Sequence, residues 1–101
     1  MYRNDITLTG TIETLPKVRT INDTYACEFL MQARSIIKHG KIKSYEDFSI
    51  AVVAYRKEAK RCITKYRKGT NLVIEGSLSF SSDQDKQYSG FYLEAKKIYK
   101  R

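Results

Sequence analysis

The stretch Lys68-Gly69-Thr70-Asn71-Leu72-Val73-Ile74-Glu75-Gly76-Ser77-Leu78 decides the fold, because a lysine–glycine turn leads directly into an alternating apolar strand. Upstream of it, Asp47 to Tyr55 alternates with period two and predicts another strand. Between the two strands, Lys57 to Arg67 predicts a basic amphipathic helix, with Gly69 as its C-cap. The helix presents its apolar residues on one side at Ala59, Cys62, Ile63 and Tyr66.

The rest of the chain is also mostly of period two. We expect further strands over Asn4–Thr14, Tyr25–Arg34 and Gly90–Tyr99. Ser35 to Glu46 is basic and has no apolar period, so it predicts a long hairpin connection, and Ser81 to Tyr88 predicts a polar loop. The order β-β-β-α-β-β, with one helix between the third and fourth strands, is that of an all-β, five-stranded OB-fold Greek-key barrel.

Length and charge restrict the function. A chain of 101 residues predicts a single domain over 1–101 with one modest core. Nineteen Lys and Arg against eleven Asp and Glu give a net charge of +8, which favours a polyanionic partner, nucleic acid above all. A domain that is merely kept soluble by surplus lysine is the alternative reading of this charge.

Membrane and export signals are absent from the sequence. The longest apolar run, Ile50 to Tyr55, is far shorter than a spanning helix, and the start of the chain has no apolar targeting core. Cys27 and Cys62 have no metal-ligand spacing and are interpreted as two reduced, buried thiols. We therefore expect a cytoplasmic, nucleoid-associated protein.

Catalysis and cofactor binding find little support. His39 is the only histidine, and it falls in the basic connection without partners for a triad. The glycines form neither dinucleotide-binding nor Walker motif. Asp83, Asp85 and Glu94 match a calcium loop in part, but Tyr88 takes the position of its required glycine. We expect no enzyme activity, no metal and no cofactor.

The chain resembles the bacterial single-stranded DNA-binding protein family from Asn4 through Ile98. Asn4-Asp5-Ile6-Thr7-Leu8-Thr9-Gly10 is similar to the opening strand of that family, and Ala26-Cys27-Glu28-Phe29-Leu30-Met31 to its second strand. Tyr66-Arg67-Lys68-Gly69, followed by Ile74-Glu75-Gly76, is the closest match. The resemblance implies sequence-tolerant binding of single-stranded DNA in replication, recombination or repair, by a homo-oligomer, dimer or tetramer.

Single-strand binding requires cations that follow the phosphates and flat rings on which bases stack. By the resemblance, Tyr55 takes the place of a stacking aromatic of the family, whose tryptophans have no counterpart here because the chain contains none. Other tyrosines and a phenylalanine are candidate replacements, and the basic connections are the candidate phosphate sites. The predicted nucleic-acid-binding residues are Lys17, Arg19, Arg34, Lys38, Lys41, Lys43, Tyr45, Tyr55, Arg56, Phe80, Lys86, Tyr88 and Tyr92.

Three alternatives stay open. RNA is an alternative ligand, because no residue marks a site for the 2′-hydroxyl. A primosome-type adaptor, similar to primosomal replication protein N, is the alternative function, with replication or primosome proteins as its partners. The chain stops at Lys96-Lys97-Ile98-Tyr99-Lys100-Arg101, where family members that recruit repair enzymes continue into an acidic tail. Either this is a truncated chain, or it is a tail-less plasmid, phage, mobile-element or organellar version.

Overall fold

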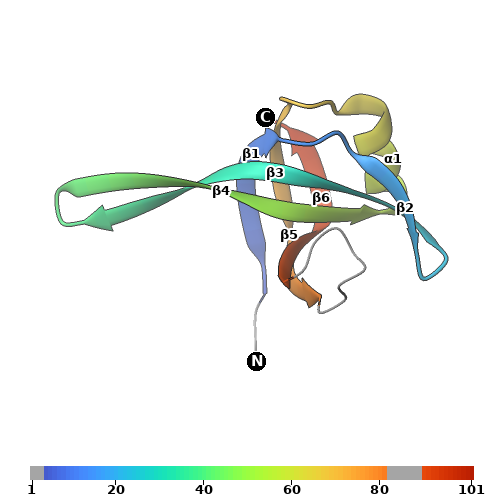
Figure 1. The fold of residues 1–101 in the computed structure, drawn as a ribbon, viewed down its shortest axis with the longest axis horizontal. Helices are drawn as coiled ribbons and strands as arrows, with labels where there is room; N and C mark the ends of the chain where they lie inside the picture. Colours follow the sequence, from blue (N-terminus) through green and yellow to red (C-terminus); the bar gives the residue numbers. More distant parts are fainter. Residues whose placement is uncertain (1–3, 82–89) are drawn as a thin grey trace.

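Strands dominate the computed structural model, which describes residues 4–81 and 90–101, and their side chains apart from those of 35–39 (Figure 1). Over these residues it contains six strands and one helix. They are β1 (Ile6–Ile12), β2 (Lys17–Ile21), β3 (Thr24–His39), β4 (Ile42–Tyr55), α1 (Arg56–Lys65), β5 (Asn71–Ser81) and β6 (Gly90–Lys100).

The sheet closes into a barrel. Its strand order is β1-β5-β6-β4-β3-β2, and β1 also pairs with β3, so that all strands except β2 form a ring. Neighbouring strands run antiparallel apart from β4 and β6, which are parallel. The predicted barrel is present, but the number of described strands is six and not five, and the helix lies between β4 and β5.

The strand that the sequence did not predict is β2. It occupies the connection after Leu15-Pro16, and it pairs with β3 from Lys17 opposite Glu28 to Ile21 opposite Thr24. Asn22 and Asp23 form the turn between the two strands, with φ of 49° and 62°, a conformation that suits a tight hairpin. Because β2 contributes no fully buried residue, its sequence carries no clear apolar alternation.

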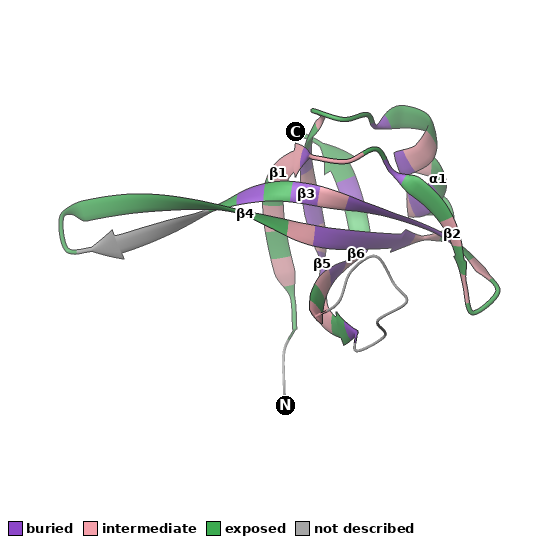
Figure 2. Ribbon diagram, viewed as in Figure 1, coloured by how far each residue is buried: buried purple, intermediate pink, exposed green. Residues whose placement is uncertain are grey.

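The predicted basic hairpin connection is present, but most of it is paired strand and not loop, because Ser35 to Glu46 continues β3 and β4. The two strands pair without a break from Ala26 opposite Tyr55 to His39 opposite Ile42, with a turn at Gly40 and Lys41. Their distal part extends from the barrel as an arm, and residues 40–49 are all exposed (Figures 1 and 2). Since residues 40–49 are exposed on both faces, no apolar period marks them as strand.

The core fills the barrel and continues under α1. Figure 2 shows the buried residues gathered in the barrel strands and on the inner side of the helix. As predicted, Ala59, Cys62 and Tyr66 are buried, and Ile63 packs against the same cluster. The backbone N–H of Ile98 in β6 donates to the Glu58 carboxylate at 3.1 Å, which ties the helix to the sheet. No helix within 4–81 or 90–101 is long and apolar enough to cross a membrane.

The helix ends earlier than predicted. It runs from Arg56 to Lys65, and its C-cap is Tyr66 in an extended conformation, not Gly69. Gly69, with φ of 90°, instead lies in the turn before β5, where its N–H donates to the carbonyl of Ile12 at 2.8 Å. The Lys-Gly turn therefore joins the end of β1 to the start of β5.

Both cysteines are free thiols and fully buried, as predicted. Cys27 comes from β3 and Cys62 from α1, and both belong to the main core cluster. A hydrogen bond to Cys27, together with burial, raises the pKa of the Cys62 thiol. The Cys62 side chain is therefore held as a neutral thiol.

Candidate nucleic-acid interface

One outer face of the barrel, formed by β2, β3, β4 and β6, carries a second apolar cluster. Because alternate residues of a strand point to opposite sides, Val52 and Ala54 enter the barrel core while Ala51 and Val53 point outward. Ala51 and Val53 are nevertheless buried, since neighbouring side chains pack over them. We call this surface the outer face; its apolar residues are Ile21, Leu30, Ala51, Val53, Tyr55 and Tyr92.

Tyr55 and Tyr92 are the two aromatic residues of the outer face. Tyr92 of β6 is the register partner of Ala51, and both tyrosines are half-buried, so part of each side chain remains accessible. Burial raises the pKa of the Tyr55 hydroxyl, and the nearby Glu94 carboxylate and Tyr92 raise it further. The structure thus brings together two of the predicted stacking residues from different strands, on one apolar floor.

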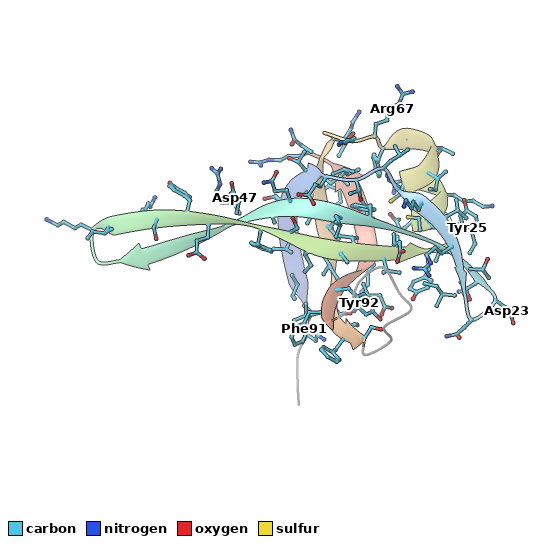
Figure 3. The ribbon with its side chains drawn as sticks, viewed as in Figure 1. Asp23, Tyr25, Asp47, Arg67, Phe91 and Tyr92 are labelled. Carbon is cyan, nitrogen blue, oxygen red and sulfur yellow. The ribbon has the colours of Figure 1, made fainter. Side chains whose placement is uncertain are left out.

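A second group of predicted residues meets where the arm leaves the barrel. Arg34 donates from Nε to Asp47 Oδ1 at 2.7 Å and from Nη2 to Oδ2 at 3.3 Å. Its guanidinium carbon also lies 5.5 Å from the ring centroid of Tyr45, a cation–π distance. The hydrogen bond from Arg34 lowers the pKa of Asp47. Asp47, labelled in Figure 3, was not among the predicted site residues.

We expect Asp47→Asn to strengthen single-stranded DNA binding, because it removes a carboxylate that competes with phosphate for Arg34. The salt dependence of binding, as the slope of log K against log salt, should steepen by about 0.7 if one more phosphate is contacted. Fluorescence anisotropy across a salt series measures both effects. Glu46→Gln, the same charge change at the next residue of the arm, is the control. Weaker binding by Asp47→Asn would mean that Asp47 orients Arg34 and does not compete for it.

Lys17 and Arg19 lie on β2, not in a loop as predicted. Arg19 is tied to an acidic residue, because its Nη1 donates to Glu28 Oε1 at 2.6 Å. The Glu28 side chain is only 5% exposed, and none of the described residues donates a hydrogen bond to its other oxygen, Oε2. Lys17, directly opposite Glu28 in the strand register, is exposed.

A small hollow opens beside Glu28. It has a volume of about 110 Å³ and lies between the chain that enters β2 and the outer side of β3 and β4. Its walls are mainly apolar, with a carboxylate, a hydroxyl and a lysine among them. The lining residues are Thr14, Leu15, Lys17, Glu28, Phe29, Leu30 and Ala51. Leu30 and Ala51 also belong to the outer face, so the hollow and the two tyrosines share one surface.

The remaining predicted residues are spread more widely. Lys41 and Lys43 are exposed on the arm, and Arg56 is exposed beside Tyr55 with φ of 55°. Phe80 is 62% exposed, but it lies on the same side of β5 as the core residues and therefore away from the outer face. Its ring contacts that of Phe91, with the two ring centroids 5.2 Å apart. Lys86, Tyr88 and the side chain of Lys38 lie outside the described residues.

Sequence reasoning missed Glu28 and Phe91. Phe91, labelled in Figure 3, lies at the start of β6 and is 63% exposed, whereas the alternating pattern of β6 assigns this position to the core. Glu28 lies on the outer side of β3, and only its pairing with the unpredicted β2 reveals its partner Arg19. The described residues contain no group of His, Cys, Asp and Glu that would hold a metal ion.

A closed barrel with an aromatic and cationic outer face defines the class of OB-fold nucleic-acid-binding domains. The family comparison makes the assignment specific: a model of the single-strand binding protein family matches residues 3–98. The chain belongs to the single-strand binding protein family. None of the curated protein sequences compared with the chain matches it.

Solved structures have the same fold. A small single-stranded DNA-binding protein from Streptomyces coelicolor is 18% identical, with a TM-score of 0.78 and coverage of 100% of this chain and 94% of that one. The SSB domain of a Synechococcus protein is 18% identical, with a TM-score of 0.71 over 98% and 97% of the two chains. A deletion mutant of the single-stranded DNA-binding protein from Thermus aquaticus is 14% identical, with a TM-score of 0.79 over 98% of this chain and 50% of that one.

Proposed function

We propose that the chain binds single-stranded DNA across the outer face, in the replication, recombination or repair steps that expose single strands. Family membership supports the ligand, and one observation supports the surface: Tyr55 and Tyr92 share the outer face with Arg19, which is bound to Glu28 beside Leu30 and Ala51. Rings on an apolar floor provide stacking platforms that tolerate any base, and the cations at the edges follow the phosphates. The role is binding and not catalysis.

The arm extends this surface. Lys41, Lys43 and Tyr45 are exposed along it, and Arg34 lies at its base. A strand that crosses the outer face would continue along the arm, where it meets further cations and one more ring. Arg19 and Arg34 are each paired with a carboxylate, so they contribute less to phosphate binding than unpaired cations do. We therefore expect the arm lysines to provide a larger share of the salt dependence of binding.

Replacement of an arm lysine tests whether the arm contacts the phosphates of the bound strand. We expect Lys43→Gln to reduce the magnitude of the salt slope by about 0.7, the loss of one phosphate contact. Lys60→Gln, which removes the same charge from the exposed side of α1, should leave the slope unchanged. Anisotropy titrations with one oligonucleotide at several salt concentrations give both slopes. An equal decrease of the salt slope in both variants would mean that the bound strand also contacts α1.

Self-association is proposed through β1. β5 pairs with one edge of β1 from Ile6 to Thr11, whereas β3 pairs with the other edge only at Gly10 to Ile12. Among the described residues no strand covers that second edge from Ile6 to Thr9, and an open edge is a template for pairing with another copy. Light scattering should then give a dimer or a larger even-numbered oligomer. A monomer at micromolar concentration would contradict this arrangement.

Direct binding assays decide the function itself. Fluorescence anisotropy with single-stranded DNA, duplex DNA and RNA of several lengths, across a salt series, compares the ligands. We expect single strands to bind more tightly than duplex, with affinity that rises with length. Weak binding that does not depend on length, or equal affinity for duplex, would contradict the proposal.

The protein-interaction adaptor is a second candidate because of the exposed pair Phe80 and Phe91. The two rings meet edge to face at 70° at the end of β5 and the start of β6, on the side away from the two tyrosines. Exposed aromatic residues of this kind suit a protein contact. If single-stranded DNA binds weakly while a Phe80→Ser/Phe91→Ser variant loses a protein partner, the adaptor is favoured.

A further inference from the structure

We propose that the hollow beside Glu28 takes the edge of one pyrimidine base and that Glu28 Oε2 accepts a hydrogen bond from the amino group of cytosine. This inference rests on the proposed function and deepens it, because it assigns a base preference to one position of a face that otherwise tolerates any base. Glu28 becomes a specificity-determining residue.

The first argument is the unsatisfied acceptor. The Glu28 side chain is 95% buried, since only 5% of it is exposed, and its Oε1 is taken by Arg19 Nη1 at 2.6 Å. Oε2 is buried as well and receives no hydrogen bond from the described residues. Buried carboxylate oxygens are normally paired, and Glu28 lines an open hollow, so its orphan acceptor indicates a donor that arrives with a ligand.

The second argument is the chemistry around this oxygen. Leu15, Leu30 and Ala51 provide apolar walls for the flat faces of a ring, and Lys17 lies at the rim for a phosphate. Thr14 Oγ1 accepts from the backbone N–H of Leu30 at 2.8 Å, and its own hydrogen can serve a base acceptor. A volume of about 110 Å³ suits the edge of a single pyrimidine and not a whole nucleotide.

The third argument concerns the competing pyrimidine. Cytosine carries an amino group, a donor, where thymine carries the O4 carbonyl, an acceptor. A carboxylate oxygen attracts the first and repels the second. Glu28 therefore favours cytosine and disfavours thymine in the hollow, whereas the stacking at Tyr55 and Tyr92 does not distinguish them.

The test combines a protein variant with a modified base. Anisotropy titrations compare three oligonucleotides of equal length: deoxycytidine, deoxythymidine, and deoxycytidine in which 2-pyrimidinone, which lacks only the amino group, replaces cytosine. For the natural protein we expect loss of the amino group to weaken binding by about tenfold, the effect of one hydrogen bond to a charged acceptor. This comparison requires no mutation and carries no risk to folding.

Glu28→Gln then tests the residue. Arg19 should keep the amide oxygen of the new side chain, which leaves the amide NH₂ facing the hollow, so the preference should move from cytosine toward thymine. The variant should no longer distinguish cytosine from 2-pyrimidinone. Glu94→Gln removes the same charge near Tyr55 on the outer face and should change affinity for all three oligonucleotides equally. Thermal unfolding of both variants checks that the fold is retained.

The outcomes separate the two proposals. Equal binding of cytosine and 2-pyrimidinone oligonucleotides by the natural protein would overturn the role of Glu28 while single-strand binding stands. An unchanged loss in Glu28→Gln would overturn it too, because the amino group would then be bound elsewhere. Absence of binding to all three oligonucleotides would instead contradict the proposed function, and the Glu28 inference would fail with it.

Discussion

Replacing Tyr55 with alanine is expected to weaken single-stranded DNA binding by about 5- to 150-fold, the range that one lost base–ring stack predicts. The same change at Tyr92 should have an effect of similar size, because both rings rise from the apolar floor formed by Ala51 and Val53. The double variant is expected to lose more than either single variant. Anisotropy with a short oligonucleotide measures the effect best, since few other contacts compensate.

Tyr55→Phe is the matched control. It retains the ring and removes only the hydroxyl, so binding should stay close to that of the natural protein. Tyr99→Ala removes a 37% exposed tyrosine from β6 and should not affect binding. Because Tyr55 also packs on Val53, each variant needs a thermal unfolding curve. Unchanged affinity in a folded Tyr55→Ala variant would mean that the bases stack elsewhere.

Gly76→Ala is expected to lower the free energy of unfolding by about 3 kcal/mol, the upper part of the range for overpacking a tight interior. Gly76 is buried in β5, at the point where the register with β6 shifts. A Cβ at this position would overlap the carbonyl oxygen of Glu94 and would lie 3.1 Å from the Cα of Ala95. Both neighbours are backbone, which a side-chain rotation cannot move. Urea denaturation followed by circular dichroism measures the loss.

Gly40→Ala provides the comparison for this prediction. Gly40 lies in the turn of the arm with φ of 62°, and a Cβ there has nothing within 4 Å. The substitution should therefore lower the free energy of unfolding only by the cost of the left-handed conformation, about 1 kcal/mol. If Gly76→Ala were as mild as Gly40→Ala, the β5–β6 pair would have room to separate at the register shift.

Burial explains which elements the sequence predicted. Ala59 and Cys62 of α1 and Leu72 and Ile74 of β5 face one core, so their spacing follows the helix or the strand period. β2 and the distal arm face solvent on most sides, and their residues are free of that constraint. Both elements form because a neighbouring strand pairs with them, and pairing leaves little trace in a single sequence.

The candidate site divides in the same way. Tyr55 was predicted because it ends a buried strand, and the resemblance gave it a role. The pairing of Arg34 with Asp47 and of Arg19 with Glu28 depends on strand register, which a sequence without its fold does not provide. Phe80 shows the converse: its alternation is that of a core residue, yet β5 extends beyond the closed part of the barrel and leaves the ring exposed.

The two buried thiols can report on local and global unfolding of the chain through their rate of chemical labelling. Cys27 and Cys62 have no exposed surface, so an alkylating reagent reaches them only when α1 lifts from the sheet or the barrel unfolds. In a chain without tryptophan, the labelling rate takes the place of intrinsic tryptophan fluorescence as a probe of stability. A ligand that binds only the folded barrel should slow the labelling of both cysteines.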